Sequence, residues 1–367
     1  MKKNVLFLAA GLLAFASCSQ DETTGLDNGG AIRFRPNVGS VTRGPILTTD
    51  NIASFKVSAS IAAAPANFFT DLQVNKAGSQ WNTAQTYYWP GTGTLRFFAY
   101  SPVDVATVSV TPTAQTINNF SPVQAVANQK DVVVAYNTGT KAANEASGVA
   151  LTFKHILSQV EVKAEIDAAA VASYDIKVLG AKLGRIPSTA NFTFPSSVVS
   201  GTLPQTHWSA AATPADYGTM LDAAVTLTGA AQTVTKDNFL MIPQQLTAWT
   251  GGNTADGAYI AVLCQISSKS GGNTTQIFPK VSGKYAYAAV PVSTNWLPGK
   301  KYTYKLKFLG SGGAGEVDPN QTNPDDPSDP NVDNTQNNGG DPVLGGPIKF
   351  TVKVDEWGEP AEEEVSL

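Results

Sequence analysis

Apolar and polar residues alternate along most of the chain from about residue 31 onward, which is the period of a β-strand with one buried face. The clearest alternating sets are Ile32, Phe34, Pro36 and Val38; Phe55, Val57, Ala59 and Ile61; Ile260, Val262, Cys264 and Ile266; Tyr302, Tyr304, Leu306 and Phe308; and Ile348, Phe350, Val352 and Val354. Turn-forming clusters separate these runs, as at 89–93 and 297–300. The best candidate for a helix, 164–172, is short. The pattern predicts an all-β protein built from β-sandwiches.

The length of 367 residues predicts about two domains. We assign an N-terminal β-sandwich domain to residues 31–168 and a C-terminal β-sandwich domain to residues 169–310. The alternating sets near residues 32–38 and 302–308 then mark the first strand of one domain and a late strand of the other.

Residues 311–346 differ from the rest of the body, because they contain seven acidic residues, five prolines and seven glycines but no Lys or Arg. With almost no large apolar residue, the tract is predicted to contribute nothing to a core and to form a mobile acidic linker or a long loop. Residues 347–358 read as a final strand, and residues 359–367 form an acidic tail.

The N-terminus has the layout of a secretory signal, in which two lysines precede an apolar run over residues 5–15 that is too short to span a bilayer. Cys18 follows small residues and resembles the lipidation box of bacterial lipoproteins, where the signal is removed before the Cys and the thiol is acylated. Residues 1–17 are then a signal peptide, and residues 18–30 a lipidated export tether that holds the chain on a membrane. The alternative is an ordinary signal whose cleavage site happens to precede a cysteine.

Composition argues against several classes of function. Charged residues make up 15% of the chain and the net charge is −4, so no positive field exists to hold a phosphate backbone and no nucleic-acid partner is expected. Two His and two Cys leave almost no material for a catalytic triad, a zinc site or a disulfide scaffold. We therefore expect no enzyme, no catalytic residues, no cofactor and no metal.

A few polar and aromatic positions suggest chemistry only weakly. Asp329, Asn331 and Asp333 match the first positions of a calcium loop, but the later Gly and Glu of such a loop are missing, so a solvated acidic segment is the simpler interpretation. The aromatic run 87–89 could stack on sugar rings, although such residues more often cap a sandwich core. His155 is expected to be structural, beside a β-bulge and hydrogen-bonded to backbone.

Five segments, taken in order behind Cys18, resemble the fimbrillin-like proteins of Bacteroidota, which are exported as lipoproteins and assemble type V pili. They are the N-terminal strand with Thr42-Arg43-Gly44, LTFKHILSQVEVK at 151–163, MIPQQL at 241–246, WLPGKKYTYKLKF at 296–308 and IKFTVKVDEW at 348–357. The pair of acids at 21–22 also looks like the surface-export signal of Bacteroidota lipoproteins. The resemblance implies two tandem transthyretin-like, Greek-key β-sandwich domains.

The resemblance also implies how the subunit assembles. An Arg-specific surface protease would cut between Arg43 and Gly44 and remove the first strand, whose inward residues are Ile32, Phe34 and Val38. Arg43 suits this role on its own sequence context, because it lies in a loop-like stretch that a protease can reach. A terminal strand of another subunit would then fill the vacated groove. The residues Ile348, Phe350, Val352 and Val354 belong either to that donor strand or to a strand that closes its own domain.

Two functions follow from these observations. The first is a structural pilus (fimbria) subunit or pilus-associated adhesin on the outer membrane and cell surface, whose partners are other pilus subunits, the Arg-specific protease and surface glycans or proteins of a host or bacterium. The alternative is a surface lipoprotein that binds glycans and never polymerises.

Overall fold

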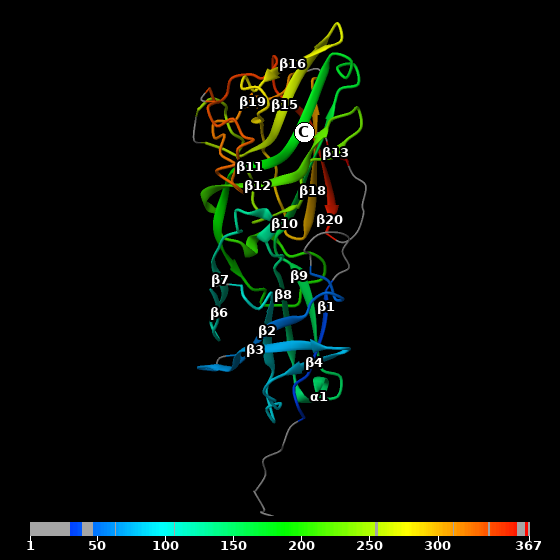
Figure 1. Ribbon diagram of the computed structural model, residues 1–367. Coiled ribbons are helices and arrows are strands. Elements are labelled where there is room, and N and C mark those ends of the chain that lie inside the picture. The colour runs from blue at the N-terminus through cyan, green and yellow to red at the C-terminus, as the bar shows by residue number, and fades with distance from the viewer. Residues whose placement is uncertain are drawn as a thin grey trace, which may run out of the picture.

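Strands form almost all of the regular structure, which confirms the predicted all-β class. The computed structural model describes residues 30–38, 47–62, 64–105, 107–253, 256–310, 312–336, 338–357 and 364–365. Within these ranges the only α-helix is α1 (Lys141–Asn144), and two 3₁₀ turns, η1 (Val126–Asn128) and η2 (Gln205–His207), accompany it. None of the helices found there is long and apolar enough to cross a membrane. The molecule is elongated, with an N-terminal sheet at one end and the C-terminal sheets at the other (Figure 1).

A seven-stranded sheet in the order β1-β9-β8-β5-β2-β3-β4 forms the N-terminal end. Its strands are β1 (Phe34–Val38), β2 (Ser54–Ile61), β3 (Asn67–Ala77), β4 (Gln80–Thr83), β5 (Leu95–Ser101), β8 (Val133–Gly139) and β9 (Val149–His155). Only β1 and β9 pair in parallel, and the other neighbours are antiparallel. One face of this sheet buries a cluster that includes Phe34, Phe55, Phe97 and Phe153.

Two further sheets form the C-terminal half. One has six strands: β10 (Ser158–Ile166), β13 (Gln232–Thr233), β14 (Phe239–Met241), β18 (Lys300–Phe308), β20 (Lys349–Glu356) and β21 (Glu364–Val365). The other has eight: β6 (Val108–Val110), β7 (Gln115–Phe120), β11 (Tyr174–Thr193), β12 (Ala212–Thr226), β15 (Tyr259–Ser270), β16 (Asn273–Phe278), β17 (Ala286–Pro291) and β19 (Glu316–Val317). Alternating residues from both sheets, such as Val162, Val262 and Tyr304, form one buried cluster.

The long strand β11 runs from the C-terminal half to the edge of the N-terminal half and belongs to both. Its first part pairs with β15, from Tyr174 opposite Ser268 to Gly184 opposite Tyr259, and its last residues pair with β7 near the N-terminal sheet. A third buried cluster, which includes Phe98 of β5 and Phe192 of β11, covers the second face of the N-terminal sheet. The two halves therefore share a strand and a core.

The change from the N-terminal to the C-terminal sheet falls earlier in the chain than the expected domain boundary after residue 168. β9 ends at His155 in the N-terminal sheet, and β10 begins at Ser158 and pairs in parallel with β18 of the C-terminal sheet. The crossing between the two sheets therefore lies directly after His155, where the sequence predicts a β-bulge.

The acidic tract 311–346 is a long loop between β18 and β20, but the expectation that it adds nothing to the core is wrong. Ala314, Val317 and Val343 belong to the main buried cluster, and β19 pairs with β17. Asp318 is 0% exposed. Small residues let the tract lie close to the sheet, and buried polar partners take the place of large apolar side chains.

Candidate functional site

The first strand, β1, is an edge strand. It pairs with β9 from Phe34 opposite Val149 to Val38 opposite Phe153, and no other strand of the described ranges pairs with its outer edge. Ile32, Phe34 and Val38 are 7%, 5% and 3% exposed. All three side chains therefore point into the N-terminal core.

Phe34 is the largest of these anchors. Its ring meets Phe55 and Phe97 edge-on, with centroids 6.0 and 5.8 Å apart. Edge-to-face pairs of this kind stabilise a core by about 0.5 to 1.5 kcal/mol beyond the area they bury. The ring thus seats β1 against two strands, β2 and β5, that are not its hydrogen-bonding neighbours.

Arg43, Gly44 and Cys18 lie outside the described residues, but the chain on both sides of 39–46 is fixed. The Thr49 hydroxyl accepts a hydrogen bond from Val38 N–H at 2.8 Å and donates one to Val38 O at 2.6 Å. Leu47 N–H donates to Asp131 Oδ2 at 2.9 Å. The segment that contains Arg43 therefore begins and ends at anchored positions beside β1.

Asp131, the partner of Leu47, is also connected through His155 to Trp357 at the end of β20. It is 1% exposed, and His155 Nδ1 donates to its Oδ2 at 2.9 Å. The imidazole stacks on Trp357, with centroids 4.5 Å apart and planes 10° from parallel. The sequence predicts a backbone partner for His155, and the structure gives it the Asp131 carboxylate instead.

The strand β20 lies in the sheet of its own chain. It pairs antiparallel with β18, from Lys300 opposite Glu356 to Lys307 opposite Lys349, and Val352 and Lys353 also face β21. Ile348 and Val352 are buried, whereas Phe350 and Val354 are half-buried. In this structure, β20 thus completes the six-stranded sheet of its own chain, and it carries Phe350, Val352 and Val354, with Ile348 directly before it.

The ends of β1 and β20 meet at one cavity of about 530 Å³. Asn37 of β1, His155 of β9 and Glu356 of β20 contribute to its lining, together with Gly299 and Trp357. Trp357 N–H donates to Gly299 O at 2.8 Å, which holds the end of β20 at the entry to β18. The predicted first and last strands, far apart in sequence, are therefore neighbours at the junction of the two halves.

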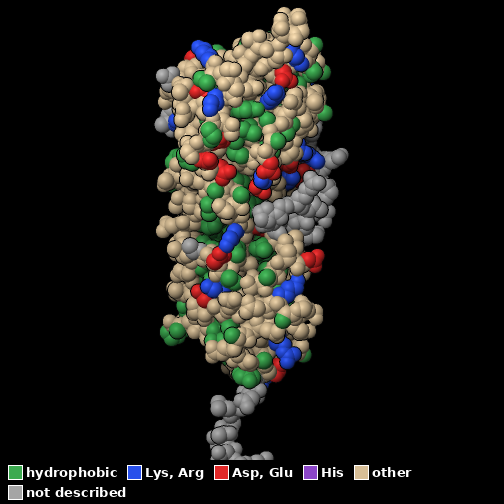
Figure 2. Space-filling view, viewed as in Figure 1, with side chains coloured by type: hydrophobic (Ala, Val, Ile, Leu, Met, Phe, Trp, Pro, Cys, Tyr) green, Lys and Arg blue, Asp and Glu red, His purple; other side chains and the backbone are tan. Residues whose placement is uncertain are grey.

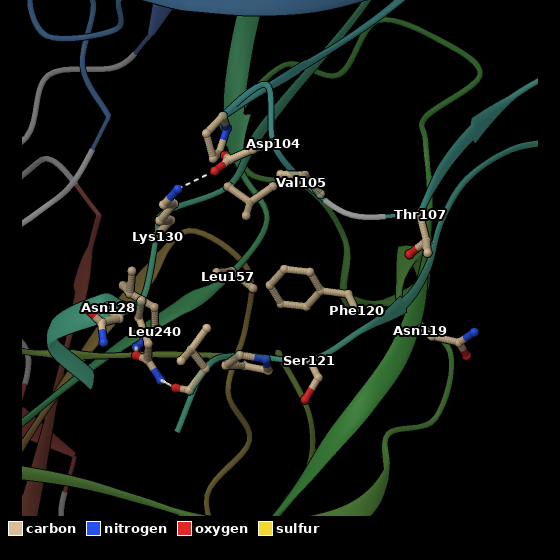
Figure 3. A pocket seen from close by; sticks show the side chains of 15 residues that line it. Asp104, Val105, Thr107, Asn119, Phe120, Ser121, Asn128, Lys130, Leu157 and Leu240 are labelled. Atoms are coloured by element: carbon tan, nitrogen blue, oxygen red, sulfur yellow. Dashed lines mark hydrogen bonds and ion pairs between the residues drawn. The ribbon is translucent and has the colours of Figure 1, made fainter. Parts of the chain in front are cut away.

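A separate cavity of about 330 Å³ lies on the junction beside η1 (Figure 3). Val105, Phe120, Leu157 and Leu240 give it an apolar lining, and Lys130 pairs with Asp104 at its rim. Its lining contains none of the predicted site residues.

The aromatic run 87–89 is exposed only in part. Trp89 is 3% exposed and packs on Phe97, Tyr87 is half-buried and packs on Phe69, and Tyr88 is 55% exposed. The predicted alternative, that such residues cap a core, accounts for the other two.

No group of acidic, His and Cys side chains that could hold a metal occurs in the described part of the chain. The carboxylates of Asp329 and Asp333 instead accept hydrogen bonds from Asn331 and Thr335 of their own loop. The face seen in Figure 2 carries scattered Lys, Arg, Asp and Glu among neutral polar atoms, without a large patch of one sign.

The chain belongs to the fimbrillin-like family, whose model matches residues 41–322. A solved fimbrial protein from Bacteroides vulgatus covers 76% of this chain and 95% of its own, with 16% identity and a TM-score of 0.51. A candidate cell adhesion protein from Bacteroides eggerthii covers 90% of this chain and 97% of its own, with 12% identity and a TM-score of 0.49. No curated protein matches. At 16% identity the Bacteroides vulgatus structure supports the fold alone, and the family match gives the class of protein.

Proposed function

We propose that this protein is a structural subunit of a pilus, or an adhesin carried by one, which is exported as a lipoprotein through Cys18 and assembled by strand exchange after a cut between Arg43 and Gly44. Membership of the fimbrillin-like family supports the pilus or adhesion role. The single observation that carries the mechanism is the position of β1, a parallel edge strand directly before the segment 39–46.

The geometry makes β1 separable from the rest of the sheet. Its only strand partner within the described ranges is β9. The other contacts that hold it and the residues before it are the buried side chains of Ile32, Phe34 and Val38 and a few hydrogen bonds, such as those from Val38 to Thr49 and from Ile32 N–H to Tyr87 O. Burial of such side chains contributes roughly 1.5 to 3 kcal/mol each. An intact chain keeps the strand at high effective concentration, whereas a cut between Arg43 and Gly44 lets it dissociate.

Loss of β1 would leave a surface that must be refilled. The outer edge of β9 would present unpaired N–H and C=O groups, and Phe55, Phe97 and Phe153 would line an open apolar groove. An extended segment with apolar residues at every second position can restore both the hydrogen bonds and the burial. A second subunit is the natural source of such a segment.

Two donor segments fit this scheme. The first is β20, whose apolar alternation at Ile348, Phe350, Val352 and Val354 suits the groove but which would have to leave β18. The second is the tail beyond Trp357, which leaves β20 in place but carries the acidic run Glu362 to Glu364. Either donor makes the assembled filament depend on the cut.

The lipidated Cys18 would hold the uncut precursor on the outer membrane until an Arg-specific surface protease releases it into the fimbrium. Assembled subunits at the cell surface would then be free to contact glycans or proteins of other cells. The partners in this scheme are other fimbrillin subunits, the protease and the membrane.

The experiment compares wild-type protein with Arg43→Ala after treatment with an Arg-specific protease. The wild type is expected to lose the residues up to Arg43 and to form multimers that resist SDS, and Arg43→Ala is expected to remain a folded monomer. Arg35→Ala is the matched control, because it removes an Arg from the paired strand and leaves Arg43 in place. Filaments from Arg43→Ala, or a wild type that stays monomeric after a verified cut, would refute the mechanism.

A further inference from the structure

A lysine and an aspartate are buried together where the acidic tract crosses the sheet. Lys182 lies in the middle of β11 and Asp318 directly after β19, and both side chains are 0% exposed. Lys182 Nζ lies 2.7 Å from Asp318 Oδ2. An ion pair removed so completely from water is costly to form, and a hydrophobic pair of similar volume is often as stable.

The two oxygens of the Asp318 carboxyl group have different surroundings. Oδ1 accepts hydrogen bonds from the Tyr259 hydroxyl and from Asn320 N–H, both at 2.8 Å. Oδ2 receives no hydrogen bond of acceptable geometry and faces Nζ alone. The donors on Oδ1 are arranged as they would be to stabilise negative charge on that oxygen.

The amine is held in place as firmly as the carboxyl group. Nζ lies over the ring of Tyr287, 4.2 Å from its centroid, and donates to the carbonyl oxygen of Asn320. The carbonyl oxygen of Thr322 is a second acceptor at 3.5 Å. The amine and the carboxyl group are therefore held next to each other, with Nζ 2.7 Å from Oδ2. Such fixed proximity is in favourable cases equivalent to about 10⁵ to 10⁸ M of one reactant.

Burial also favours the neutral form of the carboxyl group. It raises the pKa of the Asp318 carboxyl group, against the opposing effect of the Lys182 charge. Transfer of one proton from Nζ to Oδ2 replaces a buried ion pair with an amine and a carboxylic acid, which lose less on desolvation.

We propose that Lys182 and Asp318 condense in the folded protein to an intramolecular isopeptide bond. After the proton transfer, the lone pair of Nζ attacks Cγ of Asp318 and the negative charge develops on Oδ1. The Nζ–Cγ bond forms and the Cγ–Oδ2 bond breaks, and Oδ2 takes a second proton from Nζ and leaves as water. The product is an amide with one N–H and with Oδ1 as its carbonyl oxygen. No oxidant, reductant or further reactant is needed.

The bond would join the central strand β11 to the tract that leads into β20. Force applied to the C-terminal end of the chain would unravel β20 and then the tract as far as Asp318. At Asp318 the covalent link would transfer the force to β11. Without the link, the same force would go on to separate β18 from β10. Such a stop suits a protein that carries tension, although the chemistry itself does not depend on pilus assembly.

Peptide mapping of the full-length protein tests the proposal. Natively purified protein is incubated for days at neutral pH, unfolded in guanidinium and digested with trypsin. If the bond forms, trypsin cannot cut after the acylated Lys182, and peptide 178–185 appears joined to peptide 308–349 at their summed mass less one water. If the folded protein gives only free 308–349 and peptides cleaved after Lys182, the proposal is overturned.

Two controls connect a linked peptide to this site. Lys182→Arg keeps the positive charge but has no amine to acylate, so it should give no linked species. Wild-type protein kept unfolded throughout the incubation should give none either, because the geometry is then absent. Linkage that persists in the unfolded sample would show that the fold does not promote it. The wild-type digest decides the question even if Lys182→Arg does not fold.

Discussion

Replacing Phe34 with alanine tests whether β1 is held by side-chain burial. The ring is 5% exposed and packs edge-on against Phe55 and Phe97. Truncation of a buried Phe to Ala costs about 3 to 5 kcal/mol. Because β1 has a hydrogen-bonding neighbour on one side only, its surroundings can relax, and we expect a loss near the lower end, about 3 kcal/mol.

The assay is urea unfolding of the full chain followed by tryptophan fluorescence, to which Trp81 and Trp89 contribute in the N-terminal core. With a urea dependence of about 1 to 3 kcal/mol per molar, the midpoint of the N-terminal transition should fall by roughly 1 to 3 M. Arg35→Ala, on the exposed face of the same strand, should change stability by less than about 0.5 kcal/mol. Equal midpoints for the two variants would refute the reasoning, because β1 would then not be held by its buried face.

Three further outcomes follow from particular contacts. Replacing residues 316–343 with a short Gly-Ser turn should destabilise the C-terminal half by more than about 3 kcal/mol, since Lys182 loses its partner and the core loses Val317 and Val343; an unchanged urea midpoint would contradict this. Thr49→Val removes both hydrogen bonds to Val38 and should speed cleavage by an Arg-specific protease about tenfold, the equivalent of about 1.4 kcal/mol. Thr83→Val, which removes a half-buried hydroxyl bonded to Gln85 O instead, is the control. Burial raises the pKa of Glu161, but Lys301 at 2.7 Å and Lys163 outweigh it, and the folded pKa lies below the ordinary value of 4.5. The stabilisation that ionised Glu161 gives the folded state is therefore present above pH 4.5 and lost as the pH falls through the folded pKa. Glu161→Gln should accordingly be less stable than wild type by about 1 to 3 kcal/mol at pH 7. In urea titrations this difference in stability should disappear below pH 4.5.

Strand positions could be predicted well because alternation reports one buried face. The sets at 32–38, 55–61, 260–266, 302–308 and 348–354 all fall on or overlap strands, namely β1, β2, β15, β18 and β20. Their inward residues are mainly those that the period selects, such as Phe55 and Val57, both 0% exposed. The period of a strand does not give its pairing partners, so the sequence predicts a bulge where the chain crosses from β9 in one sheet to β10 in another.

The polar contacts could not be predicted, because their partners are distant in sequence and belong to residue types that are usually exposed. Asp131 and His155 are 24 positions apart in the sequence, and Lys182 and Asp318 are separated by most of the sequence that forms the C-terminal half. The glycines at 180 and 184, which bracket Lys182, were a local signal of close packing, since a Cβ on Gly184 would overlap the Tyr259 ring. The acidic composition of 311–346 hid the fact that its carboxylates and amides satisfy one another.

The N-terminal residue of the protein in its assembled form tests the central claim most directly. Filaments sheared from cells would be purified, dissociated and analysed by N-terminal sequencing and mass spectrometry. Our account predicts that subunits in filaments begin at Gly44 and lack β1, while the membrane-bound precursor begins at lipidated Cys18. Filament subunits that begin at Cys18 and retain Ile32, Phe34 and Val38 would contradict strand exchange as the assembly mechanism.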